Sequence, residues 1–507
     1  MHQNGKVLSI DELARRLQVE RSGKRIVLCH GVFDLMHIGH VRHLQQARRM
    51  GDVLVVTVTP DRFVNKGPHR PVFNESLRSE TLAGLDCTDY VAINQWPRAV
   101  EAIRLLKPNF YVKGPDYRDV EADLSGAIRQ EEEAIRSVGG QLAFTDGLTL
   151  SASHLINQHL PVFPEEVRGY LAGFSNRYSV DRVLSVLQSA GSLRVLVVGE
   201  TIIDEYQYCE AIGKSSKEPM LAVKSLSVER FAGGIQAVAN HVAGFCERVG
   251  LVSMLGAENS YQDFLHTRLK EGIQPTLLYR KNAPTIVKRR FVDRYFFKKL
   301  LEVYEMNDGE MEEADNTALC AVLSRELPRY DVVIVVDFGH GMLSPEAVDL
   351  LCSKSRFLAL NAQSNAGNYG FHMISKYPRA DYVSMAETEI RLEARSRRGD
   401  LEGMILDVSR RLDCDKVVVT RGKYGCLCYS KEEGFFSVPA FAGKVVDRVG
   451  AGDAFLAVTS LCVAQDAPME ITGLIGNAVG AQAVAMVGHR HSIERVRLSK
   501  HIESLLK

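Results

Sequence analysis

Two histidines in the segment His30–His40 have the type and spacing that nucleotide chemistry requires. The segment reads HGVFDLMHIGH, so His37 and His40 stand three residues apart with Gly39 between them. Where such a segment begins a helix, the imidazoles share a face and the helix N-terminus adds N–H donors. These groups can donate to the oxygens of a nucleoside triphosphate as its phosphorus becomes trigonal-bipyramidal. We therefore expect electrostatic stabilisation of a transition state without a covalent intermediate.

A second candidate site lies at residues 447–453, which read DRVGAGD and precede an apolar stretch. The small residues 450–452 at a helix start would leave several N–H groups pointing into one concavity, which suits a developing phosphate charge. Asp453 beside them can take the proton from a substrate hydroxyl as that hydroxyl attacks the γ-phosphate of ATP. On these residues alone, an isolated glycine-rich turn capped by Asp453 stays an alternative.

The elements around both segments indicate parallel sheets. Short β-branched runs alternate with amphipathic helical stretches, and Ile26–Cys29 and Val53–Val58 are examples of the strand candidates. This βαβ alternation predicts an α/β fold in which helices cover a parallel sheet. The histidine segment then follows the first strand of its sheet, at the edge where open α/β sheets bind ligands.

A break in this alternation divides the chain. Pro161 and Pro164 interrupt the pattern, and the strand-like run Arg194–Gly199 restarts it. The two domains on either side would have ordinary sizes. We predict four parts: a helical extension at 1–22, a first α/β domain at 23–160, a linker at 161–193, and a larger α/β domain at 194–507.

Composition excludes several classes of protein. The 507 residues include 62 Lys and Arg and 62 Asp and Glu, so the zero net charge argues against a nucleic-acid partner. The ten cysteines are scattered without zinc-site spacing, which is typical of a reducing compartment. The N-terminus has no apolar signal region and no apolar run is long enough to span a bilayer, so we expect a cytoplasmic protein without a membrane partner.

The first domain resembles the cytidylyltransferase-like nucleotidyltransferases over about residues 25–160. These enzymes join a nucleotide to a phosphorylated small molecule and release pyrophosphate. The segment GVFDLMHIGH is similar to the family signature, and VNKGPHRP, YVKGPDY and LSASH follow in the family's order. The resemblance implies a Rossmann-like domain with catalytic His37, His40 and Lys66. The implied nucleotide contacts are Gly31, Val32, Phe33, Asp34, Gly39, Arg70, Arg78, Lys113, Gly114, Asp116, Ser151 and Ser153.

Two questions about this domain stay open on the sequence. HIGH is also found in class I aminoacyl-tRNA synthetases, but the chain has no KMSKS-like loop, and the first domain is too short to hold an anticodon module as well. Ala152 and His154 depart from the Ser/Thr-rich segment that holds phosphates in the nucleotidyltransferases, so that contact is the least secure. The base of the transferred nucleotide, from ATP or CTP, is not set by the histidine motif.

The region 194–500 resembles the ribokinase/PfkB-type carbohydrate kinases. DRVGAGD is similar to their DTxGAGD signature, which implies that Asp453 is the catalytic base and that Gly450, Ala451 and Gly452 form the anion hole. The resemblance also implies that residues 208–232 form a small β lid, which can be the clasp of a homodimer. The implied ATP-binding residues are Thr420, Gly422, Gly425, Asn477 and Gly480. The implied sugar-binding residues are Asp204, Gly233, Gly234 and Asn240. Glu389 is the residue implied for Mg²⁺.

Three departures from the kinase pattern bear on its activity. Ala237 stands where related heptose kinases have Asn, and Ala386 replaces the Asn of the family's NxxE motif. The amide-rich run Leu360–Asn368 replaces a strand end that normally carries charge. These departures imply either an unusual sugar or a slow or lost kinase activity.

Together, the motifs predict two enzymes on one chain. A sugar or sugar-phosphate kinase using ATP and Mg²⁺ would share the chain with a nucleotidyltransferase that makes an NDP-sugar, heptose-like, for a surface glycan, and the order of the two steps stays open. The pairing resembles bifunctional ADP-heptose synthesis proteins, in which the kinase comes first, so we expect a reversed domain order here. The alternatives are a transferase whose kinase-like domain binds sugar or dimerises without turnover, and a non-enzymatic sugar-nucleotide sensor.

Overall fold

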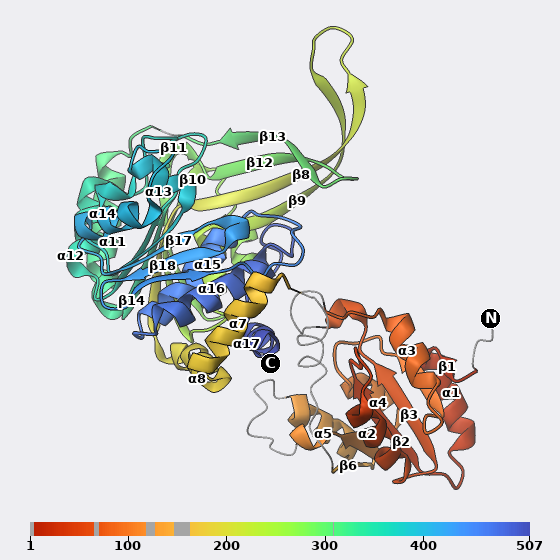
Figure 1. Ribbon diagram of the computed structural model, residues 1–507. Helices are drawn as coiled ribbons and strands as arrows, with labels where there is room; N and C mark the ends of the chain where they lie inside the picture. The colour runs from red at the N-terminus through yellow and green to blue at the C-terminus, as the bar shows by residue number, and fades with distance from the viewer. Residues whose placement is uncertain (1–4, 65–69, 118–126, 147–162, 308, 507) are drawn as a thin grey trace. The chain divides into compact units, whose positions relative to one another are not determined.

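The computed structural model describes residues 5–64, 70–117, 127–146, 163–307 and 309–506. The chain forms two compact units, residues 1–164 with 503–507 and residues 165–502. Each unit is built around its own parallel sheet (Figure 1). No helix among these described residues is both long and apolar enough to cross a membrane.

The first unit, called the transferase unit below, contains a six-stranded sheet in which all strands are parallel. In sheet order the strands are β1 (Val7–Leu8), β4 (Tyr90–Ile93), β3 (Val53–Val58), β2 (Ile26–Gly31), β5 (Phe110–Lys113) and β6 (Gln141–Phe144). The helices are α1 (Ile10–Glu20), α2 (Ile38–Arg48), α3 (Glu75–Ala83), α4 (Val100–Leu106) and α5 (Ala127–Ser137). The strand order reverses between β2 and β5, and ligands bind in α/β folds at such a switch point.

The described part of the expected extension, residues 5–22, contributes to this unit's sheet and core. β1 pairs in parallel with β4 at the sheet edge. Ser9 caps α1 through a capping box with Glu12, and the buried face of the helix includes Leu13 and Leu17. The extension is therefore an integral part of the unit, because its apolar face joins the core under the sheet.

The second unit, called the kinase unit below, contains a nine-stranded sheet whose neighbouring strands are all parallel except in the last two pairs, which are antiparallel. In sheet order the strands are β11 (Ile273–Pro284), β10 (Arg248–Glu258), β7 (Arg194–Gly199), β14 (Val332–Asp337), β15 (Leu358–Ala362), β16 (Tyr382–Ala386), β17 (Lys416–Thr420), β18 (Cys426–Ser430) and β19 (Gly434–Val438). The helices are α7 (Glu165–Arg177), α8 (Val180–Ser189), α9 (Ile235–Val242), α10 (Gln262–Arg268), α11 (Glu313–Glu326), α12 (Pro345–Lys354), α13 (Glu387–Glu393), α14 (Leu401–Arg411), α15 (Ala451–Val463), α16 (Met469–Ala483) and α17 (Arg495–Leu506).

The small β lid is a separate four-stranded sheet. Its order is β13 (Lys298–Glu305), β12 (Ile286–Asp293), β8 (Thr201–Lys214) and β9 (Leu221–Gly234). The predicted lid segment 208–232 supplies parts of β8 and β9, and the far end of this hairpin extends beyond the rest of the unit (Figure 1). The lid therefore includes more chain than the sequence indicated, because β12 and β13 are added from far along the sequence.

Residues 161–193 differ from the expected linker, because they contain α7 and α8 and belong mainly to the kinase unit. Phe174 on α7 is fully buried, and Arg177 forms an ion pair with Glu470 on α16. An amphipathic helix gains stability by burying its apolar face, and this segment finds such a face on the kinase unit.

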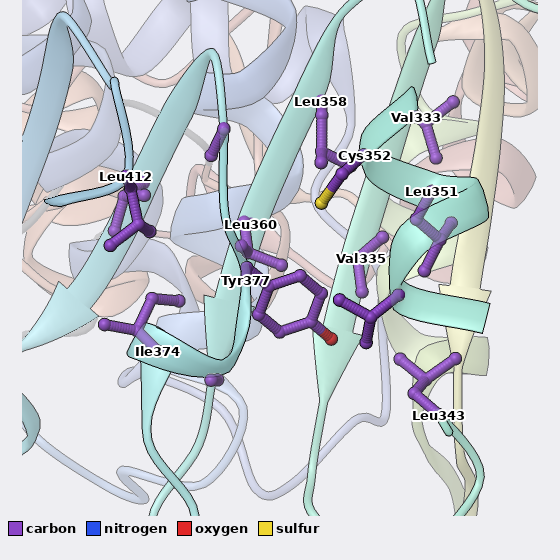
Figure 2. Close-up of a cluster of buried hydrophobic side chains, with 14 of the residues drawn as sticks. Val333, Val335, Leu343, Leu351, Cys352, Leu358, Leu360, Ile374, Tyr377 and Leu412 are labelled. Carbon is purple, nitrogen blue, oxygen red and sulfur yellow. The ribbon is translucent and has the colours of Figure 1, made fainter. Parts of the chain in front are cut away.

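The core of the kinase unit anchors one end of its central strand. Figure 2 shows side chains of β14, β15 and α12 packed with Tyr377, which is buried. The hydroxyl of Tyr377 donates to Oδ2 of Asp337, the last residue of β14, at 2.6 Å. The packed core thus fixes the carboxyl edge of the sheet, where the candidate site is built.

Candidate active sites

The loop between β2 and α2 brings His37 and His40 together at the switch point of the transferase unit. His37 is the N-cap of α2, and its Nδ1 accepts the N–H of Gly39 at 3.1 Å. The two imidazole rings are stacked, with centroids 3.9 Å apart and an interplanar angle of 26°. Because Nδ1 of His37 is an acceptor, a neutral ring carries its proton on Nε2. The predicted shared face of the two histidines is therefore present in the structure.

Phe33 defines the turn that precedes these histidines. It has a left-handed backbone, with φ of 50°, and its ring packs edge-on to His40 at a centroid distance of 5.4 Å. A Cβ on Gly31 would lie 3.0 Å from this ring. Gly31 thus leaves space for Phe33 in the loop, in addition to the nucleotide contact that the resemblance implied.

Asp34 ties this turn to a segment that follows β3. Its Oδ1 accepts the N–H groups of Val72 at 2.7 Å and Phe73 at 3.0 Å. Nη1 of Arg70 lies 3.6 Å from its Oδ2. Burial lowers the pKa of Arg70, and the charge of Asp34 opposes that effect. Asp34 and Arg70, both predicted as nucleotide contacts, therefore shape the loop around the histidines.

Arg78 on α3 is fully buried and its donors are engaged by the protein. The guanidinium donates to the carbonyls of Phe73 and Thr59 at 2.9 and 2.8 Å, and also to that of Val32. It donates to Oδ1 of Asp61 at 2.5 Å. This arrangement differs from the predicted nucleotide contact, because the guanidinium links three loop segments instead of pointing at a ligand.

Lys113 ends β5, the strand beside β2, and so lies across the switch point. Its Nζ is 2.9 Å from Oε2 of Glu131 and 4.6 Å from the ring centroid of Tyr117. Its charge adds to burial in lowering the pKa of His43 to about 4, so that ring is neutral at pH 7. Gly114 follows directly, and Asp116 lies in a short 3₁₀ turn. Lys66, Ser151 and Ser153 lie outside the described residues.

In the kinase unit, Asp453 lies in the first turn of α15 and is buried. Its Oδ1 accepts a hydrogen bond of 2.6 Å from Nε2 of Gln363. Burial raises the pKa of this carboxyl, and the charge of Asp204 adds to the effect, whereas His489 and Gln363 oppose it. A carboxylate with a raised pKa is a stronger base, which suits proton abstraction from a hydroxyl. Gly450 is the N-cap of this helix and has a left-handed backbone, with φ of 77°. Glycine adopts this conformation easily, and the N–H groups at such a helix start can bind an anion.

Asp204 on β8 is buried between charged side chains. Arg290 on β12 donates to its Oδ1, and Nε2 of His489 lies 3.4 Å from its Oδ2. Burial raises the pKa of Asp204, but the hydrogen bonds and charges of these two cations outweigh it and hold the pKa low. A Cβ on Gly233 would lie only 2.0 Å from Oδ2, so the glycine permits this approach.

His489 is a residue of this site that the sequence interpretation missed. A Cβ placed on Gly450 would lie 2.1 Å from Cε1 of His489, so the ring rests against the start of the anion hole. Its side chain is only 6% exposed. It stands in the loop after α16, in the run VGHRH, which matches none of the motifs that drew attention to the site. The ring therefore connects the anion hole to Asp204.

Glu389 lies near Asp453, and the side chain of Asn361 forms a hydrogen bond with the Glu389 carboxylate. Oε2 of Glu389 accepts the N–H of Ala386 at 2.6 Å, and Oε1 accepts that of Ser364 at 3.3 Å. Burial raises the pKa of Glu389 to about 7, and the charge of Asp453 adds to this. No group of three or more His, Cys, Asp or Glu in the described ranges is arranged to hold a metal alone. Mg²⁺ commonly binds through one or two carboxylates plus substrate phosphates, and Glu389 fits that pattern.

Some of the residues predicted to bind ATP have structural roles in the loops and strand ends of the kinase unit. Gly425 has φ of 81°, and a Cβ on it would lie 1.9 Å from the carbonyl oxygen of Val438, so only glycine is compatible. Asn477 donates to that same carbonyl at 3.1 Å and so fastens the end of β19. Gly480 on α16 has no atom near the position of a Cβ. Thr420 ends β17, and Gly422 begins the 3₁₀ turn that follows.

Asn240 does not have the free amide that a sugar contact would require. Its Nδ2 donates to the carbonyl of Arg268 at 3.0 Å, and its Oδ1 accepts the N–H of Lys270 at 2.9 Å. Both ends of the amide therefore hold the segment after α10. Ala237, one turn earlier on α9, provides no polar group in its place.

Comparisons with known proteins match both units. Residues 28–166 match the cytidylyltransferase-like family model. The bifunctional protein HldE of Geobacter sulfurreducens is 37% identical over 169 residues, covering 32% of this chain and 33% of that protein. The HldE protein of Campylobacter fetus is 45% identical over 114 residues, covering 22% and 24%. The chain thus spans about a third or less of the length of these curated relatives, and the matches do not support the expected reversal of domain order.

Solved structures share the fold of the kinase unit. Ribokinase from Thermotoga maritima superposes with a TM-score of 0.50 at 18% identity, covering 61% of this chain and 99% of that one. Phosphofructokinase-2 from Escherichia coli gives a TM-score of 0.51 at 15% identity, covering 62% and 100%. Both likenesses confirm the predicted ribokinase-like fold. The family model for pfkB carbohydrate kinases matches residues 192–495, more than half of the sequence, and the chain therefore belongs to the pfkB family of carbohydrate kinases.

Proposed function

We propose that the chain is a bifunctional enzyme that makes a nucleotide-activated sugar. The kinase unit transfers the γ-phosphate of ATP to a hydroxyl of a sugar or sugar phosphate. The transferase unit joins a nucleotide to the sugar phosphate and releases pyrophosphate. The observation that carries the proposal is the buried Asp453 at the N-terminus of α15, oriented by Gln363 beside a left-handed Gly450.

In the kinase unit, Asp453 accepts the proton of the attacking hydroxyl. The N–H groups of residues 450–452 stabilise the transferred phosphoryl charge. Mg²⁺ supplies charge neutralisation on the phosphates of ATP, and Glu389 is the residue that would hold it. Asp204, Gly233 and Gly234 form the wall on which the sugar lies.

In the transferase unit, His37 and His40 donate to the phosphate oxygens where charge develops. Lys113 adds a positive charge across the switch point, and Lys66 is assigned by the resemblance of its segment. We propose ATP as the second nucleotide and a heptose-like sugar, because the relatives named HldE resemble the chain in its transferase motifs. A nucleotide-activated sugar of this kind suits a cytoplasmic enzyme that makes a precursor for a surface glycan.

We also propose a homodimer formed through the lid. Several apolar side chains on its strands and turns are exposed. They are Ile212, Met220, Leu221, Val228 and Leu301. A monomeric surface rarely exposes such a group of residues without a partner.

A second candidate function has one specific observation in its favour. The carboxylate of Asp204 is already engaged by Arg290 and His489, which occupy the oxygens that a sugar would use. In this alternative, the chain is a nucleotidyltransferase only, and the kinase unit binds or dimerises without phosphoryl transfer.

Two variants test the proposal on the full chain. Asp453→Asn should lower ADP formation from ATP and a heptose 7-phosphate by about 10²–10⁴-fold, and leave pyrophosphate release from a sugar 1-phosphate unchanged. His37→Asn should do the reverse. Asp466→Asn, at a side chain 91% exposed on the kinase unit, is the matched control and should change neither rate. Equal ADP formation by wild type and Asp453→Asn would overturn the kinase assignment.

A further inference from the structure

A pocket of about 520 Å³ adjoins the phosphotransfer site of the kinase unit. Its walls come from the end of β9, one side of α9, the last turn of α10 with Lys270 after it, the loop that joins α16 to α17, and the first turn of α17. Phe231, Ala232 and Ala237 give it an apolar surface. Small-molecule sites typically have volumes of roughly 300–1,000 Å³ and combine such a surface with a few polar groups. The pocket is thus large enough for a monosaccharide-sized ligand.

The polar lining of this pocket is strongly cationic. Five Lys or Arg side chains line it, against two Glu. Arg490 pairs with Glu229 at 2.6 Å, and Lys270 pairs with Glu494. Arg230 pairs with Glu205 at 2.6 Å.

The remaining two cations, Arg268 and Arg497, have no carboxylate partner within the described part of the chain. Arg268 lies over the ring of Phe264, at 5.5 Å from its centroid. Neither guanidinium therefore forms an ion pair with a carboxylate there, although the charge of Arg268 helps to lower the pKa of Glu229, the partner of Arg490. A pocket that holds two such groups attracts an anion of more than one charge, because each guanidinium offers forked N–H donors to oxygens.

His489 is common to the pocket and to the site around Asp453. It lines the pocket, and its ring also rests against Gly450 and pairs with Asp204. Ala232, another lining residue, directly precedes the Gly233–Gly234 pair. A ligand in the pocket therefore lies next to the residues that would hold the acceptor sugar.

We propose that this pocket binds the phosphate group of a small phosphorylated ligand, with Arg268 and Arg497 as its main partners. A phosphate has three terminal oxygens and up to two charges, which match two forked donors better than a single carboxylate does. The apolar side of the pocket suits the carbon skeleton of the same ligand. The proposal concerns binding and does not depend on turnover by the kinase unit.

Titration calorimetry on the full chain tests this binding, with inorganic phosphate and glucose 6-phosphate as probes and glucose as the uncharged comparison. The variant Arg268→Ala/Arg497→Ala should weaken binding of the phosphate probes at least tenfold. Arg248→Ala/Arg398→Ala removes the same charge from exposed positions of the kinase unit and should bind as the wild type does. Equal binding by wild type and the pocket variant, including no saturable binding by either, would overturn the proposal.

The phosphate can have two sources, which steady-state kinetics separates. If the bound phosphate belongs to the acceptor sugar, the pocket variant should have a higher KM for the phosphorylated sugar and an unchanged KM for the unphosphorylated sugar. If the bound phosphate is instead a separate effector, inorganic phosphate should change kcat without competing with the sugar. Asp453→Asn should retain phosphate binding in either case, so loss of the kinase function and loss of this site are distinguishable.

Discussion

Nε2 of His489 lies 3.4 Å from Oδ2 of Asp204, inside the kinase unit and against the start of the anion hole. The pair joins a loop near the C-terminus of this unit to the lid strand β8. Arg290 on β12 completes the group by donating to the other oxygen of Asp204. The carboxylate of Asp204 therefore couples three features. These are the position of the lid, the charge on His489 and the shape of the anion hole at Gly450.

This coupling predicts a pH dependence of stability. Burial alone would lower the pKa of His489, but the hydrogen bond and charge of Asp204, with the charge of Asp453, outweigh both burial and the nearby charge of Arg290 and raise it. A raised pKa in the folded state gives stability that is complete below about pH 6.5 and is lost as the pH rises through the folded value. His489→Gln should remove this contribution, so the difference in Tm from wild type should be larger at pH 6 than at pH 9.

Differences in Tm between the two proteins isolate His489 from other groups. Burial raises the pKa of Glu200 to about 7, with the charge of Asp337 adding to it, so this carboxyl also makes stability fall as pH rises. Glu200 is present in both proteins, and its effect cancels in the difference. Because the entropy of unfolding rises with chain length, each kcal/mol of coupling corresponds to about 1–2 °C in Tm for a unit of this size. A difference in Tm that is constant from pH 6 to 9 would show that the histidine is not charged in the folded protein.

Gly450→Ala should destabilise the kinase unit by more than about 2 kcal/mol. A left-handed residue other than glycine costs about 1–3 kcal/mol, and the new Cβ would also collide with the ring of His489. Denaturant unfolding measures this cost in the wild-type and His489→Ala backgrounds. The loss of unfolding free energy should be smaller in the His489→Ala background, because there the substitution at Gly450 causes only backbone strain. Gly452→Ala, which meets no atom within 4 Å, is the stability control. Equal costs in both backgrounds would mean that the ring does not lie against Gly450.

Arg78→Met should unfold the transferase unit selectively. The substitution leaves the carbonyls of Phe73 and Thr59 without their donor in a buried position, and each such loss costs about 1–3 kcal/mol. Thermal unfolding followed by calorimetry should show the transition of the transferase unit at lower temperature and that of the kinase unit unchanged. Arg104→Met, at an exposed position on α4, is the control. A variant of Arg78 with wild-type stability and lost nucleotide binding would restore the contact that the sequence suggested.

The fold was largely predictable because its signals are local. Runs such as Val53–Val58 and Val332–Val336 are apolar and β-branched, and they form fully buried central strands. The place of α7 and α8 in the kinase unit was not predicted, because both follow a proline-containing break and their stability comes from the surface of that unit on which they pack. The lid was underestimated for a similar reason, since β12 pairs with β8 across more than 80 residues of sequence.

The site was predictable where a motif is short and contiguous. The stacking of His37 with His40 and the position of Asp453 behind Gly450 follow from the chain direction within a few residues. Partners that lie far apart in sequence could not be inferred. Arg78 was predicted from a resemblance to a family motif and Asn240 as an amide near the Gly233–Gly234 pair, yet both side chains bond to backbone groups here. His489 belongs to no motif, and only the folded chain brings it to Asp204.

Gln363 should set the acid limb of the kinase pH profile. Its Nε2 donates to Oδ1 of Asp453 at 2.6 Å, and this hydrogen bond lowers a pKa that burial raises. Gln363→Met removes the donor, so the pKa of Asp453 rises and the base becomes protonated at higher pH. The acid limb of kcat/KM should therefore move to higher pH, with much of the rate recovered on the alkaline side. Gln274→Met, at an exposed position on β11, should leave the profile unchanged. A uniform loss of rate at every pH would show that Gln363 only supports the local structure and does not tune the base.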